Sequence, residues 1–246
     1  MARVDRDVNR EESRIRKVYD SYELNQKKWS LRNRGNRAIY EERARLIKWK
    51  IETAGMLDSS LMILDIGCGD GNGLQMLRLL GYLPNNLFGI DLLEDRIGRA
   101  KEQYPDMHFK VESAAKLQFA RSMFDIVVLF TVLSSILDED LARRVTQEAH
   151  RVLKPGGAVL WYDFRFNNPF NRNVRGIPKR KIETYFPGYR TRLRTITLLP
   201  PLARRLGYFT RFLYPILSAV PFLRTHWCGL LWKNGSDGED ANEAFV

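Results

Sequence analysis

The chain has 246 residues, of which 44% are hydrophobic and 28% charged, values that are ordinary for one folded domain with added segments. Its two cysteines exclude a disulfide framework, and the polar N-terminal segment has no apolar run of the kind found in a signal peptide. We therefore expect a cytoplasmic protein.

Basic charge is concentrated in the last third of the chain. The formal net charge is +11, and residues 165–233 contain 14 Lys and Arg against a single acidic residue, Glu183. Residues 61–164 contain 14 acidic and 11 basic side chains. Such an uneven distribution predicts an anionic partner.

The first 60 residues predict a helical cap. Apolar side chains recur at helical spacing over 14–22 and 40–54, and a polar connector that contains Trp29 lies between them. From residue 61 the pattern changes, so we expect the cap, 1–60, to precede a larger domain, 61–233.

Strands and helices alternate over 61–163. Short apolar runs predict strands at 61–66, 86–90, 107–111, 124–130 and 158–163. Helical spacing predicts helices at 71–80, 94–103 and, after the capping residue Asp138, up to 153. Repeated βα units indicate an α/β fold with a doubly wound, mostly parallel sheet, whose ligands bind beyond the carboxyl ends of the strands.

The remainder of the chain is less regular. We predict a helix near 179–186, a strand over 189–199 and a last strand over 225–233, with 165–224 forming loops and covers on the acceptor side. The apolar segment 206–223 contains Arg211 and two prolines, which makes it a poor transmembrane helix. It is expected either to cover the sheet or to form an apolar surface that meets a membrane. Residues 234–246 are rich in Gly and acid and are predicted to be disordered.

A glycine-rich turn follows the first predicted strand, with the sequence Asp65-Ile66-Gly67-Cys68-Gly69-Asp70-Gly71. Glycines let the backbone approach a ligand, and the amides that begin the next helix favour a negatively charged group. Asp91 ends the second predicted strand, where a carboxylate can accept both hydroxyls of a ribose. Asn72 occupies the place of the third glycine of a dinucleotide motif, so a nucleoside ligand is favoured over a dinucleotide.

Residues 61–163 resemble the class I S-adenosylmethionine-dependent methyltransferases of the group that includes the ubiquinone-biosynthesis enzymes. The resemblance rests on the glycine turn, Asp91, and the segments 112–119, 124–130 and 153–157. It implies a Rossmann-like sheet of seven strands with the last one antiparallel. It also implies S-adenosylmethionine as cofactor and S-adenosylhomocysteine as product. The cofactor residues that it implies are Asp65, Gly67, Cys68, Gly69, Gly71, Asp91, Leu92, Ser113, Ala114 and Phe130.

The chain departs from this family at two places. Ser113 stands where an aspartate usually contacts the adenine, so that contact is expected from the backbone at Ala114. Ser134 and Ser135 stand where many relatives carry histidines, which excludes a histidine base there. Asp163 is the candidate general base, and no cluster of His and Cys predicts a metal.

The loop after the fifth predicted strand combines arginines and asparagines. Arg suits carboxylate or phosphate and Asn suits sugar hydroxyls, although such a loop can also be a solvated turn. The loop, the segment near Trp29 and the last predicted strand resemble methyltransferases encoded with bacterial surface-polysaccharide genes. That resemblance implies a hydroxyl on a small, glycan-linked or lipid-linked acceptor. The expected acceptor contacts are Tyr22, Trp29, Arg165, Asn168, Arg172 and Arg175.

Three functions stay open. The favoured one is O-methylation of a small or glycan-linked anionic acceptor, with no obligate protein partner and with peripheral contact to the inner face of the membrane through 206–223. An RNA methyltransferase would explain the basic flanks, but the sequence has no added RNA-binding domain, so nucleic acid is not expected. A cofactor-binding protein without catalytic activity is the third, and the intact glycine turn argues against it.

Overall fold

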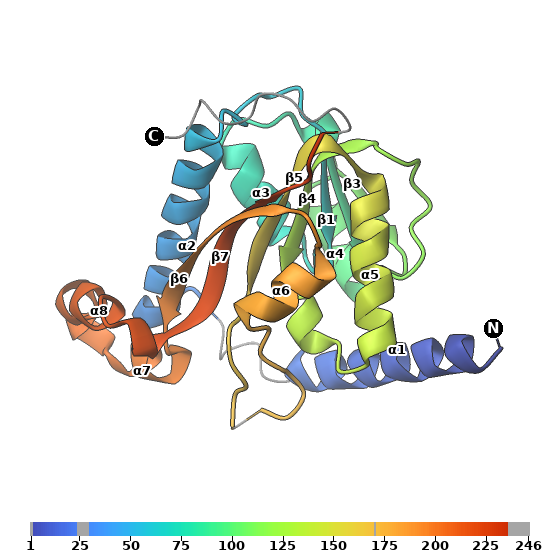
Figure 1. Cartoon of the computed structure of the whole chain (residues 1–246). Coiled ribbons are helices and arrows are strands. Elements are labelled where there is room, and N and C mark those ends of the chain that lie inside the picture. The colour runs from blue at the N-terminus through green and yellow to red at the C-terminus, as the bar shows by residue number, and fades with distance from the viewer. Residues whose placement is uncertain (1, 24–29, 170, 236–246) are drawn as a thin grey trace.

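The computed structural model describes residues 2–23, 30–169 and 171–235, and its centre is one seven-stranded sheet (Figure 1). The strand order is β3-β2-β1-β4-β5-β7-β6. Strands β1 to β5 pair in parallel, and β7 runs antiparallel between β5 and β6, which confirms the expected sheet. The strands are β1 (Ile63–Ile66), β2 (Leu87–Asp91), β3 (His108–Val111), β4 (Phe124–Phe130), β5 (Leu153–Phe164), β6 (Arg190–Leu198) and β7 (Arg224–Trp232).

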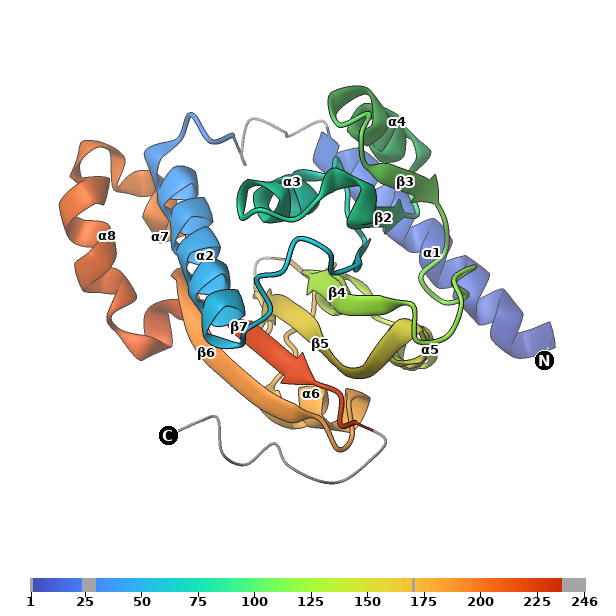
Figure 2. The ribbon, with the colours of Figure 1, turned by 90° about the horizontal axis from the view of Figure 1, so that it is seen from above.

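Helices cover both faces of the sheet (Figure 2). In β4, Ile126 and Val128 enter the core on one face while Val127 and Leu129 enter the core on the other, because successive side chains of a strand point to opposite sides. This is why the buried strands read as continuous apolar runs. On the first face lie α2 (Arg34–Thr53), α3 (Asn72–Leu79) and α4 (Glu94–Gln103), and on the second lie α5 (Glu139–Val152) and α6 (Lys179–Tyr185).

The first helix, α1 (Ala2–Glu23), crosses the edge at which the parallel strands end (Figure 1). The carboxylate of Glu11 accepts the backbone N–H of Leu137 at 2.6 Å, beyond the end of β4. On another part of α1, the Arg16 guanidinium donates to the carbonyl of Leu92, just after β2. The helix therefore spans the edge where ligands of such sheets bind.

Some element boundaries differ from the predictions. The expected turn at 154–157 lies within β5, which begins at Leu153, and a register shift opposite β4 accommodates it. Both cap helices begin earlier than predicted, and α2 does so because the Asn33 side chain accepts the N–H groups of Gly35 and Asn36. Polar helix ends of this kind give no apolar periodicity.

Two short helices precede β7: α7 (Pro200–Arg205) ends just before the apolar segment 206–223, and α8 (Thr210–Ser218) lies within it. One side of α8 is anchored, since Tyr214 is buried and its hydroxyl donates to Glu42 at 2.7 Å. No helix among the described residues is long and apolar enough to cross a membrane. Residues 236–246, which hold most of the predicted disordered tail, lie outside the described part of the chain.

Candidate active site

The glycine turn after β1 adopts a backbone that favours glycine. Gly67, Gly69 and Gly71 have φ angles of 74°, 54° and 79°, in the left-handed region. A Cβ on Gly71 would lie 2.9 Å from the ring of Phe109, so this position also lacks room for a side chain. The tight turn predicted from the glycine spacing is therefore present, and it leads directly into α3.

The carboxylate of Asp91 ties the end of β2 to this turn. Its two oxygens accept the N–H groups of Gly69 and Leu93, each at 2.9 Å. The N–H groups of Gly67 and Cys68 donate to the carbonyl of Ile90 at 2.8 and 2.9 Å. The turn and the β2 end thus form one rigid wall.

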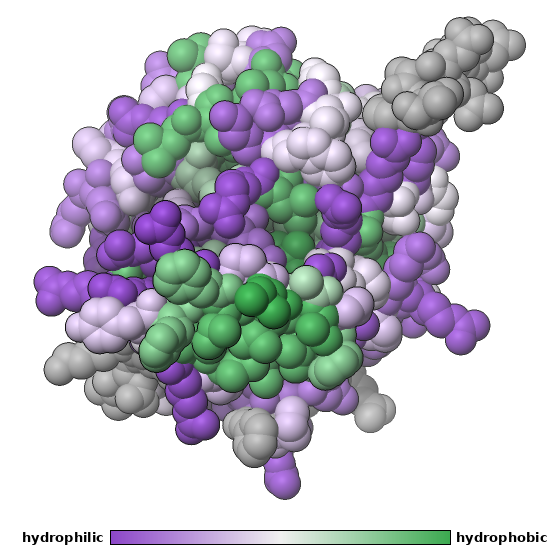
Figure 3. All heavy atoms as spheres, turned by 90° about the vertical axis from the view of Figure 1, so that its left-hand side faces the viewer, coloured by the Kyte–Doolittle hydropathy of each residue, from purple (hydrophilic) through white to green (hydrophobic). Residues whose placement is uncertain are grey.

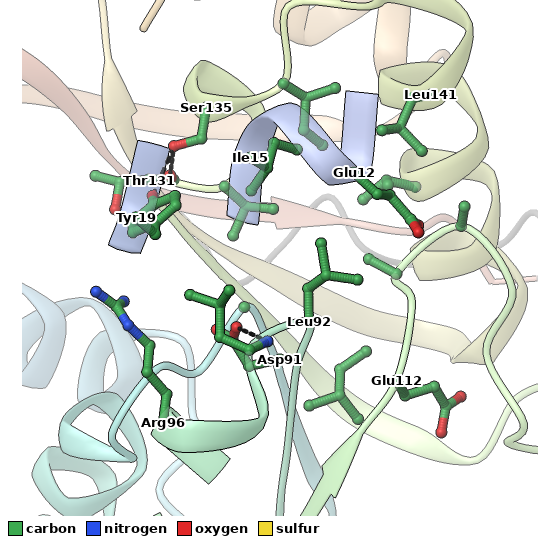
Figure 4. Close-up of a pocket in the computed structure, with 18 of the residues that line it drawn as sticks. Glu12, Ile15, Tyr19, Asp91, Leu92, Arg96, Glu112, Thr131, Ser135 and Leu141 are labelled. Carbon is green, nitrogen blue, oxygen red and sulfur yellow. Dashed lines mark hydrogen bonds between the residues drawn. The ribbon is translucent and has the colours of Figure 1, made fainter. Parts of the chain in front are cut away.

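A cavity, here called the cofactor cavity, lies between this wall and α1 (Figure 4). Glu12, Ile15 and Tyr19 project from α1 on the side of the cavity opposite Asp91 and Leu92. Of the cofactor residues expected from the sequence, Gly67, Asp91, Leu92, Ala114 and Phe130 line the cavity. Asp65, Cys68, Gly69, Gly71 and Ser113 are not in its lining but lie in the same strand ends and turns.

The α1 side of the cavity was not expected from the sequence, which singled out no cofactor contact on this helix. The Tyr19 hydroxyl and Ser135 Oγ lie 2.8 Å apart, and the Arg96 guanidinium lies 4.7 Å from the centre of the Tyr19 ring. The Ser113 hydroxyl donates a hydrogen bond to the carboxylate of Glu12. The spacing of Ile15 and Tyr19 indicates a helix face, but what that face covers is decided by tertiary packing.

Asp65 lies at the carboxyl end of β1 and is 2% exposed. Burial raises the pKa of its carboxyl to about 8, the charge of Asp91 adds to this effect, and Arg43 opposes it. Its Oδ1 atom has no hydrogen-bond partner. A buried carboxyl oxygen without a donor fits the ammonium group of a methionine-derived ligand.

A second cavity of about 550 Å³, here called the acceptor cavity, adjoins the first. Tyr19, Thr131 and Ser135 line both cavities and so form their common boundary. Thr131 has a φ of 56°, which is strained for a β-branched residue and typical of functional sites. Most of the acceptor cavity's other lining is aromatic or apolar, and it includes Tyr22, Leu31, Ile39, Tyr40, Tyr162, Phe164, Val174, Pro200 and His226.

Arg43 of α2 supplies the positive charge of the acceptor cavity. Its guanidinium lies 5.3 Å from the ring centre of Phe130 and 5.0 Å from that of Tyr162. Its Nε is buried and has no hydrogen-bond partner. His226 also lines the cavity, but burial lowers its pKa to about 3, so it is neutral near pH 7.

Of the acceptor residues expected from the sequence, Tyr22 lines the acceptor cavity, and the other described ones do not. Tyr22 lines the acceptor cavity, where its hydroxyl accepts the side-chain amide of Asn171 at 2.8 Å, whereas Trp29 lies outside the described residues. Arg165 donates to the carbonyl of Pro221, and Arg175 pairs with Glu139 at 3.1 Å. The lining of the acceptor cavity does not include Arg165, Asn168, Arg172 or Arg175.

Asp163, the expected general base, is 1% exposed and lines neither of the two cavities. Its carboxylate accepts the N–H of Ser134 at 3.0 Å and that of Phe164 at 2.8 Å. Burial raises its pKa to about 6. These contacts fix the turn that carries Ser135, and its action as a base stays a prediction. Among the described residues, no group of three or more His, Cys, Asp or Glu is placed to hold a metal ion.

This fold and this glycine turn define a nucleoside-binding α/β protein, and comparison with known proteins identifies its family. A model of a methyltransferase domain matches residues 63–157. A 2-phytyl-1,4-naphtoquinone methyltransferase of Nostoc punctiforme is 30% identical over 217 residues, 85% of this chain and 81% of that protein. A demethylmenaquinone methyltransferase of Listeria welshimeri is 30% identical over 126 residues, 48% of this chain and 51% of that protein.

Solved structures agree on the fold. The crystal structure of an S-adenosylmethionine-dependent methyltransferase from Methanosarcina mazei matches with a TM-score of 0.56 at 21% identity, over 73% of this chain and 95% of that one. The chain belongs to the class I S-adenosylmethionine-dependent methyltransferases, which confirms the enzyme class and the cofactor predicted from the sequence. The bound cofactor supplies a methyl group on a positively charged sulfur.

Proposed function

We propose that this methyltransferase acts on a flat aromatic acceptor that carries a hydroxyl group, of the phenol or hydroquinone type. The observation that carries this proposal is the lining of the acceptor cavity, where aromatic side chains surround the guanidinium of Arg43, whose Nε has no hydrogen-bond partner. The cavity's volume lies in the range of small-molecule sites. The two relatives described above are a 2-phytyl-1,4-naphtoquinone methyltransferase and a demethylmenaquinone methyltransferase, and these names are compatible with such an acceptor.

Arg43 would hold the acceptor oxygen and favour its ionised form. A guanidinium inside a poorly hydrated cavity lowers the pKa of a nearby phenol and stabilises the phenolate as it attacks. The phenolate forms a bond to the methyl carbon as the carbon–sulfur bond breaks, and the hydroxyl proton passes to water. Because ionisation is supplied by Arg43, this reaction needs no histidine base.

The boundary between the cavities would be the place of transfer. Tyr19, Thr131 and Ser135 line both cavities, so an acceptor held against Arg43 would approach the methyl group where the two cavities meet. Methyl transfer is an in-line displacement, and holding the two reactants at close distance removes much of its barrier. The proposed acceptor is neutral in solution and becomes anionic at Arg43, which differs from the anionic acceptor and the loop arginines expected from the sequence.

The proposal is tested with S-adenosylmethionine labelled with ¹³C in its methyl group and three acceptors: 1,4-naphthohydroquinone, a simple phenol and a uridine diphosphate sugar acid. We expect a methylated aromatic product, whose ¹³C shift distinguishes oxygen from carbon methylation. Methylation of the sugar acid alone would reject the aromatic acceptor and favour the glycan predicted from the loop.

Replacing Arg43 tests its role directly. Arg43→Met keeps the packing over the two rings but loses the charge, and it should lower kcat/KM for the aromatic acceptor by about 1.5–3 kcal/mol, the scale of a charge-assisted hydrogen bond. Affinity for S-adenosylhomocysteine should fall by less than this and only through Asp65, because loss of the Arg43 charge leaves the pKa of that carboxyl higher. Arg45→Met, an exposed position on the same helix, is the matched control. Equal turnover in both variants would contradict the proposal.

A further inference from the structure

A group of large apolar side chains covers α8 and the turns beside it. Tyr208, Phe209, Phe212, Ile216 and Phe222 are between 64% and 81% exposed. Figure 3 shows the green surface that gathers over α7 and α8, and we call these five residues the α8 face. Folded proteins seldom expose so many large apolar groups together unless the surface binds something.

The exposure is not the result of a loosely held helix. Tyr214 and Thr210 are buried on the opposite side of α8, and Tyr214 packs with Leu198 and Ala203. The hydroxyl of Tyr214 is fixed by Glu42. A surface helix usually turns polar residues outward. Helix α8 instead has apolar side chains on its buried side and on its outward side, and the rest of the described chain does not cover the outward side.

The charge around the α8 face is positive. The guanidinium of Arg34 lies 4.3 Å from the ring centre of Tyr208, and Arg205 and Arg211 are exposed beside the apolar side chains. The whole segment 184–235, which includes the face, contains no Asp or Glu. Apolar side chains ringed by arginines suit a surface that is apolar inside and anionic outside.

The α8 face and the acceptor cavity lie on neighbouring elements of the fold. Pro200, the first residue of α7, and Leu31, just before α2, line the acceptor cavity. The same two helices are in tight contact, since a Cβ on Gly35 of α2 would lie 2.1 Å from the carbonyl oxygen of Ala203 in α7. Helix α8, which carries much of the α8 face, is also held on α2 through the hydrogen bond from Tyr214 to Glu42, so the acceptor cavity and the α8 face share α2 as their support.

We propose that the α8 face docks on an anionic lipid bilayer, with its aromatic side chains in the interface and its arginines on the headgroup phosphates. The nine-residue helix α8 is too short to span the bilayer and would lie in its plane. A symmetric pair of chains joined through this face would bring Arg34, Arg205 and Arg211 near their own copies, so charge disfavours a second copy as the partner. The inference deepens the proposed function, because it would bring the acceptor cavity to a source of lipophilic aromatic acceptors.

Vesicle sedimentation of the full chain tests this inference without any acceptor or turnover. The wild type should bind vesicles of phosphatidylglycerol and phosphatidylcholine, and bind pure phosphatidylcholine more weakly. Phe212→Ser with Ile216→Ser should weaken partitioning by about tenfold or more, because two apolar groups leave the interface. Leu79→Ser, which removes an equally exposed apolar residue from α3, should partition like the wild type.

Three outcomes would overturn the inference. They are absence of vesicle binding by the wild type, equal binding by the double variant, and a wild-type dimer in sedimentation velocity that the double variant loses. The last outcome would identify a second copy as the partner. Calorimetry with S-adenosylhomocysteine verifies that each variant is folded. Since acceptor methylation is measured separately, failure here leaves the proposed function standing, and the reverse also holds.

Discussion

At the scale of single residues, Asp65 is a carboxyl that the fold holds in its neutral form. The pKa of its carboxyl is about 8 in the folded chain against an ordinary value of 3.8, and burial is the largest cause. Between these two values the folded chain binds a proton that the unfolded chain has lost, so the contribution of Asp65 to stability falls as the pH rises from about 4 to about 8. The ammonium group of a bound ligand would favour the ionised carboxylate of Asp65 over the protonated carboxyl that the fold alone favours.

Cofactor affinity should therefore depend on pH through Asp65. We expect affinity for S-adenosylhomocysteine to rise from pH 6 to pH 8 by up to about tenfold per pH unit and then to level off. Proton release on binding is measured by calorimetry in buffers of different ionisation enthalpy. Asp65→Asn should bind more weakly and release no proton from this site. A wild type without proton release at pH 7 would show that Asp65 does not meet the ammonium.

The sequence predicted the local part of the site and missed its long-range part. The glycine turn and Asp91 are recognisable because their spacing along the chain determines their geometry. Arg43 and Glu12 come to the cavities only through the packing of α1 and α2. The loop arginines were predicted to bind the acceptor because of their charge. In the structure Arg165 donates to a backbone carbonyl, and Arg175 donates to another and pairs with Glu139. A count of charges along the sequence does not reveal these partners.

At the scale of elements, α2 connects the sheet to the cover of the acceptor side. Ile47 and Ile51 of α2 are fully buried against the sheet, and Gly35 at its other end touches the backbone of α7. The strands and most helices were predictable because each carries its own apolar period. The contact between α2 and α7 was not, since it depends on the absence of a side chain at a single position.

Two glycine substitutions distinguish the effect of this contact on the free energy of unfolding from the effect of helix propensity. Gly35→Ala would place a Cβ 2.1 Å from the Ala203 carbonyl and should lower the free energy of unfolding by about 1–3 kcal/mol. Gly98→Ala, in the exposed middle of α4 with open space around it, should raise it by about 0.5–1 kcal/mol. Urea unfolding measures both. Stabilisation by Gly35→Ala would mean that α7 does not pack on α2 as described.

At the scale of the whole molecule, two cavities lie at the edge where the parallel strands end. Helix α1 lines one side of the cofactor cavity, and α2 contributes to the aromatic and apolar lining of the acceptor cavity. The position of this edge follows from the βα order, so the sequence predicted the edge at which the two cavities lie. What the acceptor cavity selects depends on side chains from α1, α2, β5, β6 and β7, which meet only in the folded chain.

The most direct test of the account is a calorimetric titration of the wild type and Asp91→Ala with S-adenosylhomocysteine and with NADH. We expect one bound S-adenosylhomocysteine per chain, an affinity lower by about 1.5–3 kcal/mol in Asp91→Ala, and no appreciable binding of NADH. Circular dichroism of the variant verifies that it is folded. Tight binding of NADH, or the same S-adenosylhomocysteine affinity in both proteins, would contradict the placement of the cofactor between the glycine turn, Asp91 and α1.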